Sequence, residues 1–106
     1  MLGEIYLNKA LKTEKTFCFW NKNKNKENAS ELFEKSGDCF SREEKFEQSI
    51  FSYTKAIDCY TYNENYLSCG KCYEKIGNLL YKKEHDLDSC VEKYLLAIEF
   101  YLKALN

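Results

Sequence analysis

Residues 33–56 read FEKSGDCFSREEKFEQSIFSYTKA, and this stretch decides the fold because large and small side chains alternate along it at fixed spacing. The spaced positions are Phe33, Ser36, Gly37, Phe40, Ser49, Tyr53 and Ala56. Small side chains let two helix backbones approach each other, and aromatic side chains fill the space beside the crossing. The stretch therefore predicts a pair of antiparallel helices.

The same pattern recurs later in the chain. The segment that begins at Phe33 returns at Tyr73, 40 positions further on, and Tyr53 returns at Tyr94 after 41 positions. A helical hairpin that repeats along a chain is typical of tetratricopeptide arrays, whose usual period is about 34 residues. We therefore expect an all-α, right-handed, tetratricopeptide-like superhelix of about five antiparallel helices, with hairpins longer than the usual ones.

Apolar residues at steps of three and four place the first two helices. We expect the first helix over residues 4–15 and a polar loop over residues 16–27. The second helix is expected to open at Asn28 as its N-cap, because Glu31 follows at the capping-box spacing. Its predicted buried residues are Ala29, Leu32, Phe33, Gly37 and Phe40.

The remaining helices are placed in the same way. A second capping-box spacing over residues 41–44 predicts the start of the third helix. The fourth helix is expected from Tyr66 onward, and the fifth from Asp86 or Asp88 to the last residues. The predicted inward residues of the fifth helix are Leu87, Cys90, Val91, Tyr94, Ala97, Ile98 and Tyr101.

Length and composition suit one small helical-repeat domain over residues 1–106, since 44% of the residues are hydrophobic and 16% are aromatic. The formal net charge of −1 gives no basic field that would favour nucleic acid as a partner. No apolar run approaches the roughly 20 residues that span a bilayer, and the first 15 residues do not resemble a secretory leader. We therefore expect a cytoplasmic protein.

Six cysteines are expected to be reduced in that compartment, where free cysteine behaves as a small hydrophobic residue. The pair Cys69 and Cys72 has the spacing of a redox pair or of half a zinc site. However, a second such pair is missing, and the only histidine, His85, falls in a predicted turn. The sequence therefore favours no metal, no cofactor and no catalytic residue, with a redox or metal protein as a remote alternative.

The predicted loop carries three large aromatic residues, Phe17, Phe19 and Trp20, followed by the alternating lysines Lys22 and Lys24. Aromatic clusters in soluble domains usually fold back onto the core, and the pattern alone favours that interpretation. The other interpretation is an exposed tip whose rings enter a bilayer interface while lysines attract anionic headgroups.

These features resemble the amino-terminal part of the alpha-type soluble NSF attachment proteins. The segments that carry the resemblance are Ala10-Leu11-Lys12, Phe17-Cys18-Phe19-Trp20, residues 29–38 and residues 97–101. The order of short helix, aromatic loop and long repeats is more specific than the repeat residues themselves. Members of that family are longer than this chain, so the resemblance implies an amino-terminal fragment.

The resemblance implies a non-enzymatic adaptor in vesicle fusion and protein transport. Such proteins bind SNARE complexes and recruit the NSF-type ATPase that disassembles them, and the carboxy-terminal part that engages the ATPase has no counterpart here. It also implies that Phe17, Phe19 and Trp20, with Lys22 and Lys24, contact the membrane, which makes the protein peripheral on membranes.

Candidate SNARE contacts are Lys71, Lys75 and Lys82, which share one polar side of the predicted fourth helix, although ordinary solvation explains them as well. The alternative function is a tetratricopeptide-type cochaperone or scaffold module that binds peptide tails in its groove. Such a groove needs clustered cationic and amide side chains, for which Lys71 and Asn78 are weak candidates.

Overall fold

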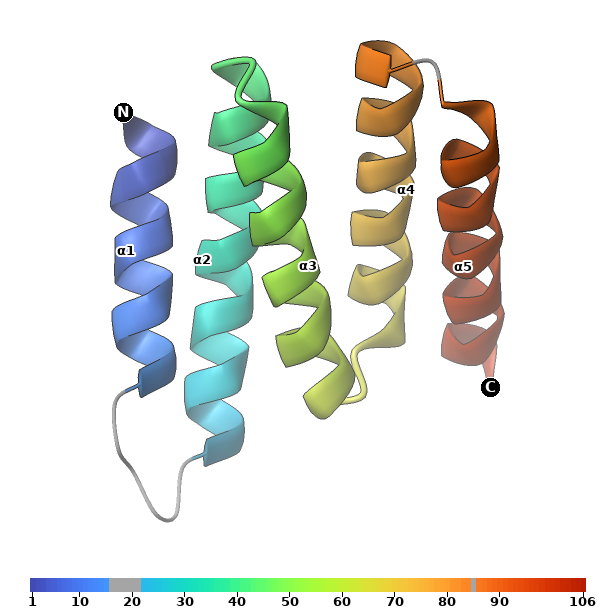
Figure 1. Cartoon of the computed structure of the whole chain (residues 1–106). Coiled ribbons are helices and arrows are strands. Elements are labelled where there is room, and N and C mark those ends of the chain that lie inside the picture. The colour runs from blue at the N-terminus through green and yellow to red at the C-terminus, as the bar shows by residue number, and fades with distance from the viewer. Residues whose placement is uncertain (16–21, 85) are drawn as a thin grey trace.

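The computed structural model describes residues 1–15, 22–84 and 86–106, and these residues form helices joined by short turns. The helices are α1 (Leu2–Lys15), α2 (Lys22–Arg42), α3 (Phe46–Tyr62), α4 (Tyr66–Glu84) and α5 (Leu87–Leu105). They stand side by side in chain order and alternate in direction (Figure 1). The fold is therefore all-α and tetratricopeptide-like, as the sequence predicted.

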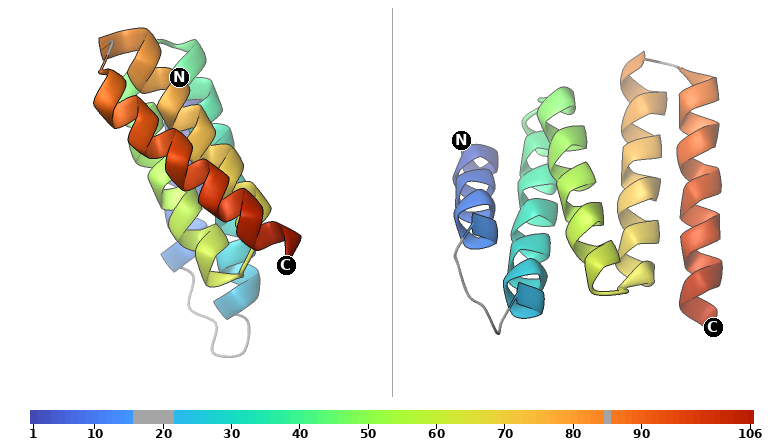
Figure 2. Two further views of the ribbon diagram at one scale, coloured as in Figure 1. Left: turned by 90° about the vertical axis from the view of Figure 1, so that its right-hand side faces the viewer. Right: turned by 60° about the horizontal axis from the view of Figure 1, so that its bottom comes forward.

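The helices form a single twisted layer, whose extents along its three principal axes are 43 × 38 × 14 Å (Figure 2). Each helix packs chiefly against its neighbours in sequence. The core lies along the seams between these helices and is formed by Ala10, Ala29, Phe33, Tyr53, Ala56, Ile57, Cys59, Tyr60, Cys69, Cys72, Ile76 and Leu79. None of the described helices is long and apolar enough to cross a membrane.

The predicted close crossing of the first repeat is confirmed. A Cβ atom added at Gly37 would lie 2.6 Å from the ring of Tyr53, well inside ordinary contact distance. Ser49 Oγ donates a hydrogen bond of 2.7 Å to the carbonyl oxygen of Gly37 across the same seam. In the second repeat, a Cβ atom added at Gly77 would lie 2.7 Å from the ring of Tyr94.

Helix α2 begins at Lys22, so the prediction that it opens at Asn28 is wrong. The end of the expected 16–27 loop, from Lys22 onward, is therefore helical. Alternating asparagine and lysine give little intrinsic helix propensity, but Lys26 Nζ lies 2.9 Å from Glu14 Oε2 on α1. This contact, just after the first turn, and the packing of α1 on α2 stabilise a helix start that the propensity alone would not.

The capping box predicted at residues 41–44 is also wrong, because α2 continues to Arg42 and the N-cap of α3 is Lys45, which makes no side-chain cap. The turn is instead closed by backbone bonds, from Lys45 N to Phe40 O at 2.9 Å and from Glu44 N to Ser41 O at 3.1 Å. This is a Schellman motif, and it places Glu44 at a φ of 60°.

The turn from α3 to α4 has the same form, with Glu64 at a φ of 59°. Asn65 N donates to Tyr60 O at 2.9 Å, and Glu64 N donates to Thr61 O at 3.0 Å. Both turns thus place a glutamate where glycine is usual.

The expected start of α5 is confirmed, since Asp86 caps the helix by accepting a hydrogen bond from Ser89 N at 3.1 Å. Its predicted inward face is only partly right. Cys90 and Ala97 are buried, but the side chains of Leu87, Val91 and Ile98 are more than half exposed. These three residues face outward because no described helix packs on that side of α5.

Candidate interaction surface

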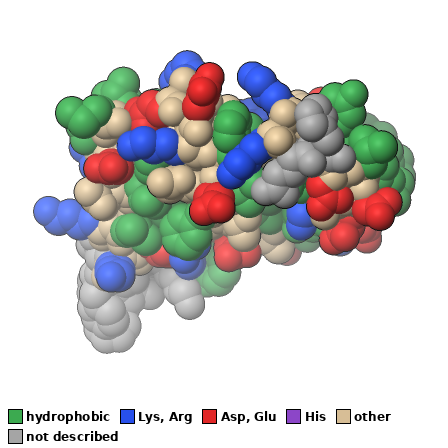
Figure 3. Space-filling model, turned by 45° about the horizontal axis from the view of Figure 1, so that its top comes forward, with side chains coloured by type: hydrophobic (Ala, Val, Ile, Leu, Met, Phe, Trp, Pro, Cys, Tyr) green, Lys and Arg blue, Asp and Glu red, His purple; other side chains and the backbone are tan. Residues whose placement is uncertain are grey.

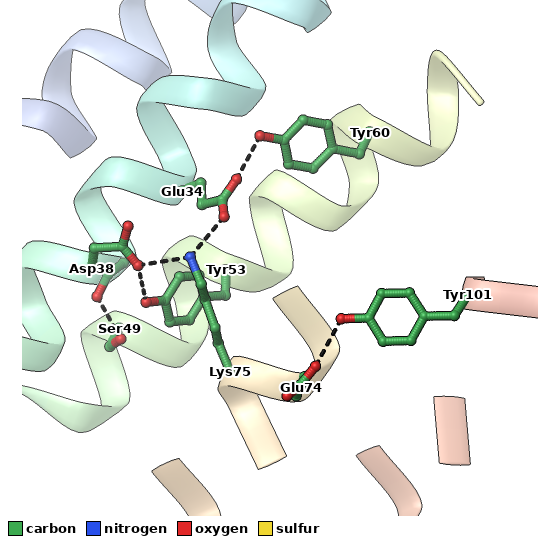
Figure 4. A network of polar contacts seen from close by, with 9 residues as sticks. Glu34, Asp38, Ser49, Tyr53, Tyr60, Glu74, Lys75 and Tyr101 are labelled. Carbon is green, nitrogen blue, oxygen red and sulfur yellow. Dashed lines mark hydrogen bonds and ion pairs between the residues drawn. The ribbon is translucent and has the colours of Figure 1, made fainter. Parts of the chain in front are cut away.

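A network of polar side chains joins α2, α3 and α4 (Figure 4). Tyr60 on α3 donates a hydrogen bond of 2.6 Å to Glu34 Oε1 on α2, and Tyr53 donates to Asp38 Oδ1. Lys75 reaches across from α4, with its Nζ 2.7 Å from Glu34 Oε2 and 3.1 Å from Asp38 Oδ1. One lysine therefore ties α4 to α2 across α3.

The contacts of the network keep the lysine and the two tyrosine hydroxyls protonated. Burial alone would lower the pKa of Lys75, but the carboxylates of Glu34 and Asp38 outweigh it, so the pKa is raised. Burial, and then the acceptor carboxylates, raise the pKa values of Tyr53 and Tyr60. At neutral pH the lysine is charged and both hydroxyls remain donors.

The second repeat carries half of the same network. Tyr101 on α5 donates a hydrogen bond of 2.7 Å to Glu74 Oε1 on α4, and Tyr94 donates to Asn78 Oδ1. Sequence reasoning identified the repeating tyrosines as packing residues and missed that each is paired with a polar side chain. The available signal was the recurrence of glutamate at position 34 as Glu74, and of Asp38 as Asn78.

The three predicted SNARE-binding lysines do not share one environment. Lys71 and Lys82 are exposed on α4, and neither forms an ion pair with another described residue. Lys75 is half-buried, and its ammonium is held by the two carboxylates of α2. The lysines available to a partner on this side of α4 are therefore Lys71 and Lys82.

A second ionic cluster joins the end of α1 to α2 and α3. Glu14, near the end of α1, forms ion pairs with Lys26 on α2 at 2.9 Å and with Lys55 on α3 at 3.3 Å. Burial would raise the pKa of Glu14, but the two lysines lower it. The end of α1 and the start of α2 are thereby held together.

The predicted membrane-contact residues Phe17, Phe19 and Trp20 lie outside the described residues. Lys22 and Lys24 fall in the first turn of α2, directly after that segment. The two lysines therefore follow the aromatic residues closely in sequence, and the Glu14 cluster joins the helices on either side of residues 16–21.

The cysteine pair lies inside α4 and both side chains are fully buried. Burial raises the pKa values of Cys69 and Cys72, which disfavours the thiolate that redox and metal chemistry require. Over residues 1–15, 22–84 and 86–106 no group of cysteine, histidine and carboxylate side chains has the arrangement of a metal site.

The groove residues of the alternative function are also separated by their contacts. The side-chain oxygen of Asn78 accepts the hydroxyl of Tyr94, whereas Lys71 is free in the solvent. The oxygen of Asn78 is thus already occupied by a side chain of the same domain, which does not favour a peptide clamp at this position.

Comparison with known proteins identifies one family. The family model described as soluble NSF attachment protein, SNAP, matches residues 18–104. Neither the curated proteins nor the solved structures contain a match to the chain. Because the matched residues cover most of the chain, and because the helical array has the arrangement expected from the resemblance, this chain belongs to the soluble NSF attachment protein family.

Proposed function

We propose that this chain is a non-enzymatic adaptor in vesicle fusion and intracellular protein transport, which binds SNARE complexes and the membrane and helps to recruit an NSF-type ATPase. The observation that carries the proposal is the family match over residues 18–104. The attachment-protein role belongs to the family as a whole, and its assignment to particular surfaces of this chain rests on the residues described below.

The proposed SNARE contacts are Lys71 and Lys82, with Lys75 as a neighbour that holds the helix in place. All three lie within about 40° of one another around α4, since successive residues of a helix are about 100° apart. An assembled SNARE coiled coil with acidic side chains would meet two free ammonium groups on this side. Lys75 supports the surface because its ion pairs fix α4 against α2.

The proposed membrane contact consists of Phe17, Phe19 and Trp20, assisted by Lys22 and Lys24. Aromatic rings partition into the bilayer interface, and nearby lysines add attraction to anionic headgroups. The ionic cluster around Glu14 supports this role, because it joins α1 to α2 and α3 on either side of residues 16–21. The protein would thus be cytoplasmic and peripheral on membranes.

Co-sedimentation with liposomes tests the membrane contact. The parent is compared with a triple variant, Phe17→Ser, Phe19→Ser and Trp20→Ser, on vesicles with and without anionic lipid, and circular dichroism checks that both are folded. We expect the parent to bind and the folded variant to lose binding. If the parent does not bind liposomes, or if the variant unfolds, these aromatic residues are instead part of the core.

A further inference from the structure

A small pocket opens where the first half of α2 meets the end of α3 and the turn into α4, at the lower end of the molecule in Figure 1. Its volume is about 210 Å³, and its lining consists of Glu27, Ser30, Glu31, Tyr60, Asn63 and Asn65. Sites for drug-sized molecules span about 300–1,000 Å³, so this pocket has room for a single side chain of a partner. The proposed contacts with SNARE complexes and with the membrane do not include these residues.

The buried part of the lining offers two hydroxyl oxygens whose own protons are already committed. Ser30 is fully buried, and its Oγ donates a hydrogen bond of 2.6 Å to the carbonyl oxygen of Glu27. Tyr60 is only 7% exposed, and its hydroxyl donates to Glu34, as Figure 4 shows. Each of these two oxygen atoms therefore keeps only lone pairs for a ligand, which must be a hydrogen-bond donor.

The exposed part of the lining carries two carboxylates. Glu27 and Glu31 lie on one side of α2 because they are four residues apart, and neither forms an ion pair with a described residue. The neighbouring Lys26 is paired with Glu14 on α1, and Lys75 is paired with two other carboxylates of α2. Like charges at this spacing repel each other, so a cation between them is favoured.

The pocket also has one hydrogen-bond donor without a partner. Asn63 Nδ2 is buried and forms no hydrogen bond with a described group. The backbone here is fixed, since Asn63 N donates to Tyr60 O at 3.2 Å where α3 ends. The terminal torsion of an asparagine side chain is soft, so a small rotation turns this N–H toward the pocket. A ligand that supplies an acceptor, such as a peptide carbonyl oxygen, satisfies it.

Recognition at this pocket is local, because no broad charge field surrounds the molecule. The formal net charge is −1, and Figure 3 shows acidic and basic side chains mixed over one face of the protein. The ligand is therefore selected by the groups that line the pocket. These groups call for a positive charge, several donors and one acceptor nearby.

We infer that this pocket binds an arginine side chain of a partner protein. A guanidinium group is planar, always charged, and has five N–H donors and no acceptor, so it matches the carboxylates of Glu27 and Glu31 and the buried hydroxyl oxygens. It also stacks on aromatic rings, as the ring of Tyr60 allows. The carbonyl oxygen beside the arginine accepts from Asn63 Nδ2. The inference does not depend on the proposed adaptor function.

A blocked tripeptide, acetyl-Gly-Arg-Gly-amide, tests the inference in an NMR titration of the full chain labelled with ¹⁵N. The side-chain amide signals of Asn63 and Asn65 report directly on the pocket. We expect saturable shifts of these signals, with a dissociation constant in the millimolar range because one side chain makes few contacts. A peptide with citrulline, the neutral counterpart of arginine, should bind at least about tenfold more weakly, and a lysine peptide about two- to fivefold more weakly.

Two protein variants with the same change in net charge assign the effect to the pocket. Glu27→Gln combined with Glu31→Gln should weaken binding of the arginine peptide at least about fivefold. Glu47→Gln combined with Glu92→Gln, at exposed carboxylates of α3 and α5 outside the pocket, is the matched control and should leave binding unchanged. Circular dichroism confirms that both variants are folded.

Other results would overturn the inference. These are absence of saturable shifts, shifts confined to signals away from the pocket, equal binding of the arginine and citrulline peptides, and binding that the Glu27 and Glu31 variant leaves intact. Equal binding of the lysine peptide would exclude selection of a guanidinium. Displacement of the arginine peptide by calcium chloride would identify a metal ion as the occupant. Displacement by vesicles with phosphatidylethanolamine, but not by phosphatidylcholine vesicles, would identify a lipid amine.

Discussion

Replacement of Gly37 by alanine should destabilise the protein although alanine is the better helix former. The added Cβ would lie 2.6 Å from the Tyr53 ring, whereas carbon atoms in contact are about 3.5–4.0 Å apart. The ring must therefore move by about 1 Å, and its hydroxyl is hydrogen-bonded to Asp38. Lys75 also lies over the ring, at 5.5 Å from its centre, which restricts the movement further.

The expected net cost of Gly37→Ala follows from three contributions. Overpacking costs about 1–3 kcal/mol, a strained hydrogen bond costs about 1 kcal/mol, and the helix propensity of alanine returns about 1 kcal/mol. The free energy of unfolding should thus fall by about 1–3 kcal/mol, and Gly37→Leu should cost at least as much.

Urea denaturation followed by circular dichroism measures this change. Lys35→Ala is the matched control on the same helix, because Lys35 is exposed, and it should change stability by less than about 0.5 kcal/mol. Gly37→Ala should cost less in a Tyr53→Leu background than in the parent, because the smaller side chain relieves the contact. A Gly37→Ala protein as stable as the parent would refute the close crossing.

Three further predictions concern the polar network and the turns. Lys75→Met should lower the free energy of unfolding by about 1 kcal/mol, because the ion pair is partly buried: 36% of the lysine side chain is exposed but only 19% of that of Glu34. A double-mutant cycle with Glu34→Gln should show a coupling of at least about 0.5 kcal/mol. The pKa of Lys75 is raised above 10.5 and those of Tyr53 and Tyr60 above 10.0, so their contribution is complete below about pH 10 and is lost as the pH rises through the folded values. Urea midpoints should therefore be lower at about pH 11 than at about pH 9, and less so after both tyrosines are replaced by phenylalanine. Glu64→Gly should increase the free energy of unfolding by about 0.5–1 kcal/mol and so raise the melting temperature, because glycine adopts the φ of 59° without strain. An unchanged or lower melting temperature would contradict this prediction.

Local sequence patterns predicted the helices well because the same residues set both the repeat and the packing. Gly37 and Tyr53 were recognised from their spacing alone, and the structure places them in contact. Asp86 was predicted as a possible helix start from its position after the turn, and it is the N-cap. Such features depend on neighbours along the chain or on a seam that recurs in every repeat.

The features that the sequence could not predict depend on contacts between distant residues. The early start of α2 relies on Glu14 of the preceding helix, and periodicity carries no information about that ion pair. Leu87, Val91 and Ile98 on the exposed face of α5 occupy the repeat positions of Phe46, Ile50 and Ile57, which pack on the core, so periodicity alone could not distinguish the two faces. The internal role of Lys75 required the positions of Glu34 and Asp38 on another helix.

Binding to an assembled SNARE coiled coil is the most direct test of the proposed adaptor function. Biolayer interferometry at low and at moderate salt would compare the parent with a Lys71→Glu, Lys82→Glu variant and with Lys9→Glu, a charge reversal at an exposed lysine of α1. The account predicts that the parent binds, that the double variant binds several-fold more weakly with a smaller salt dependence, and that Lys9→Glu matches the parent. A folded parent that does not bind the complex, or a Lys9→Glu protein that loses as much affinity as the double variant, would contradict it.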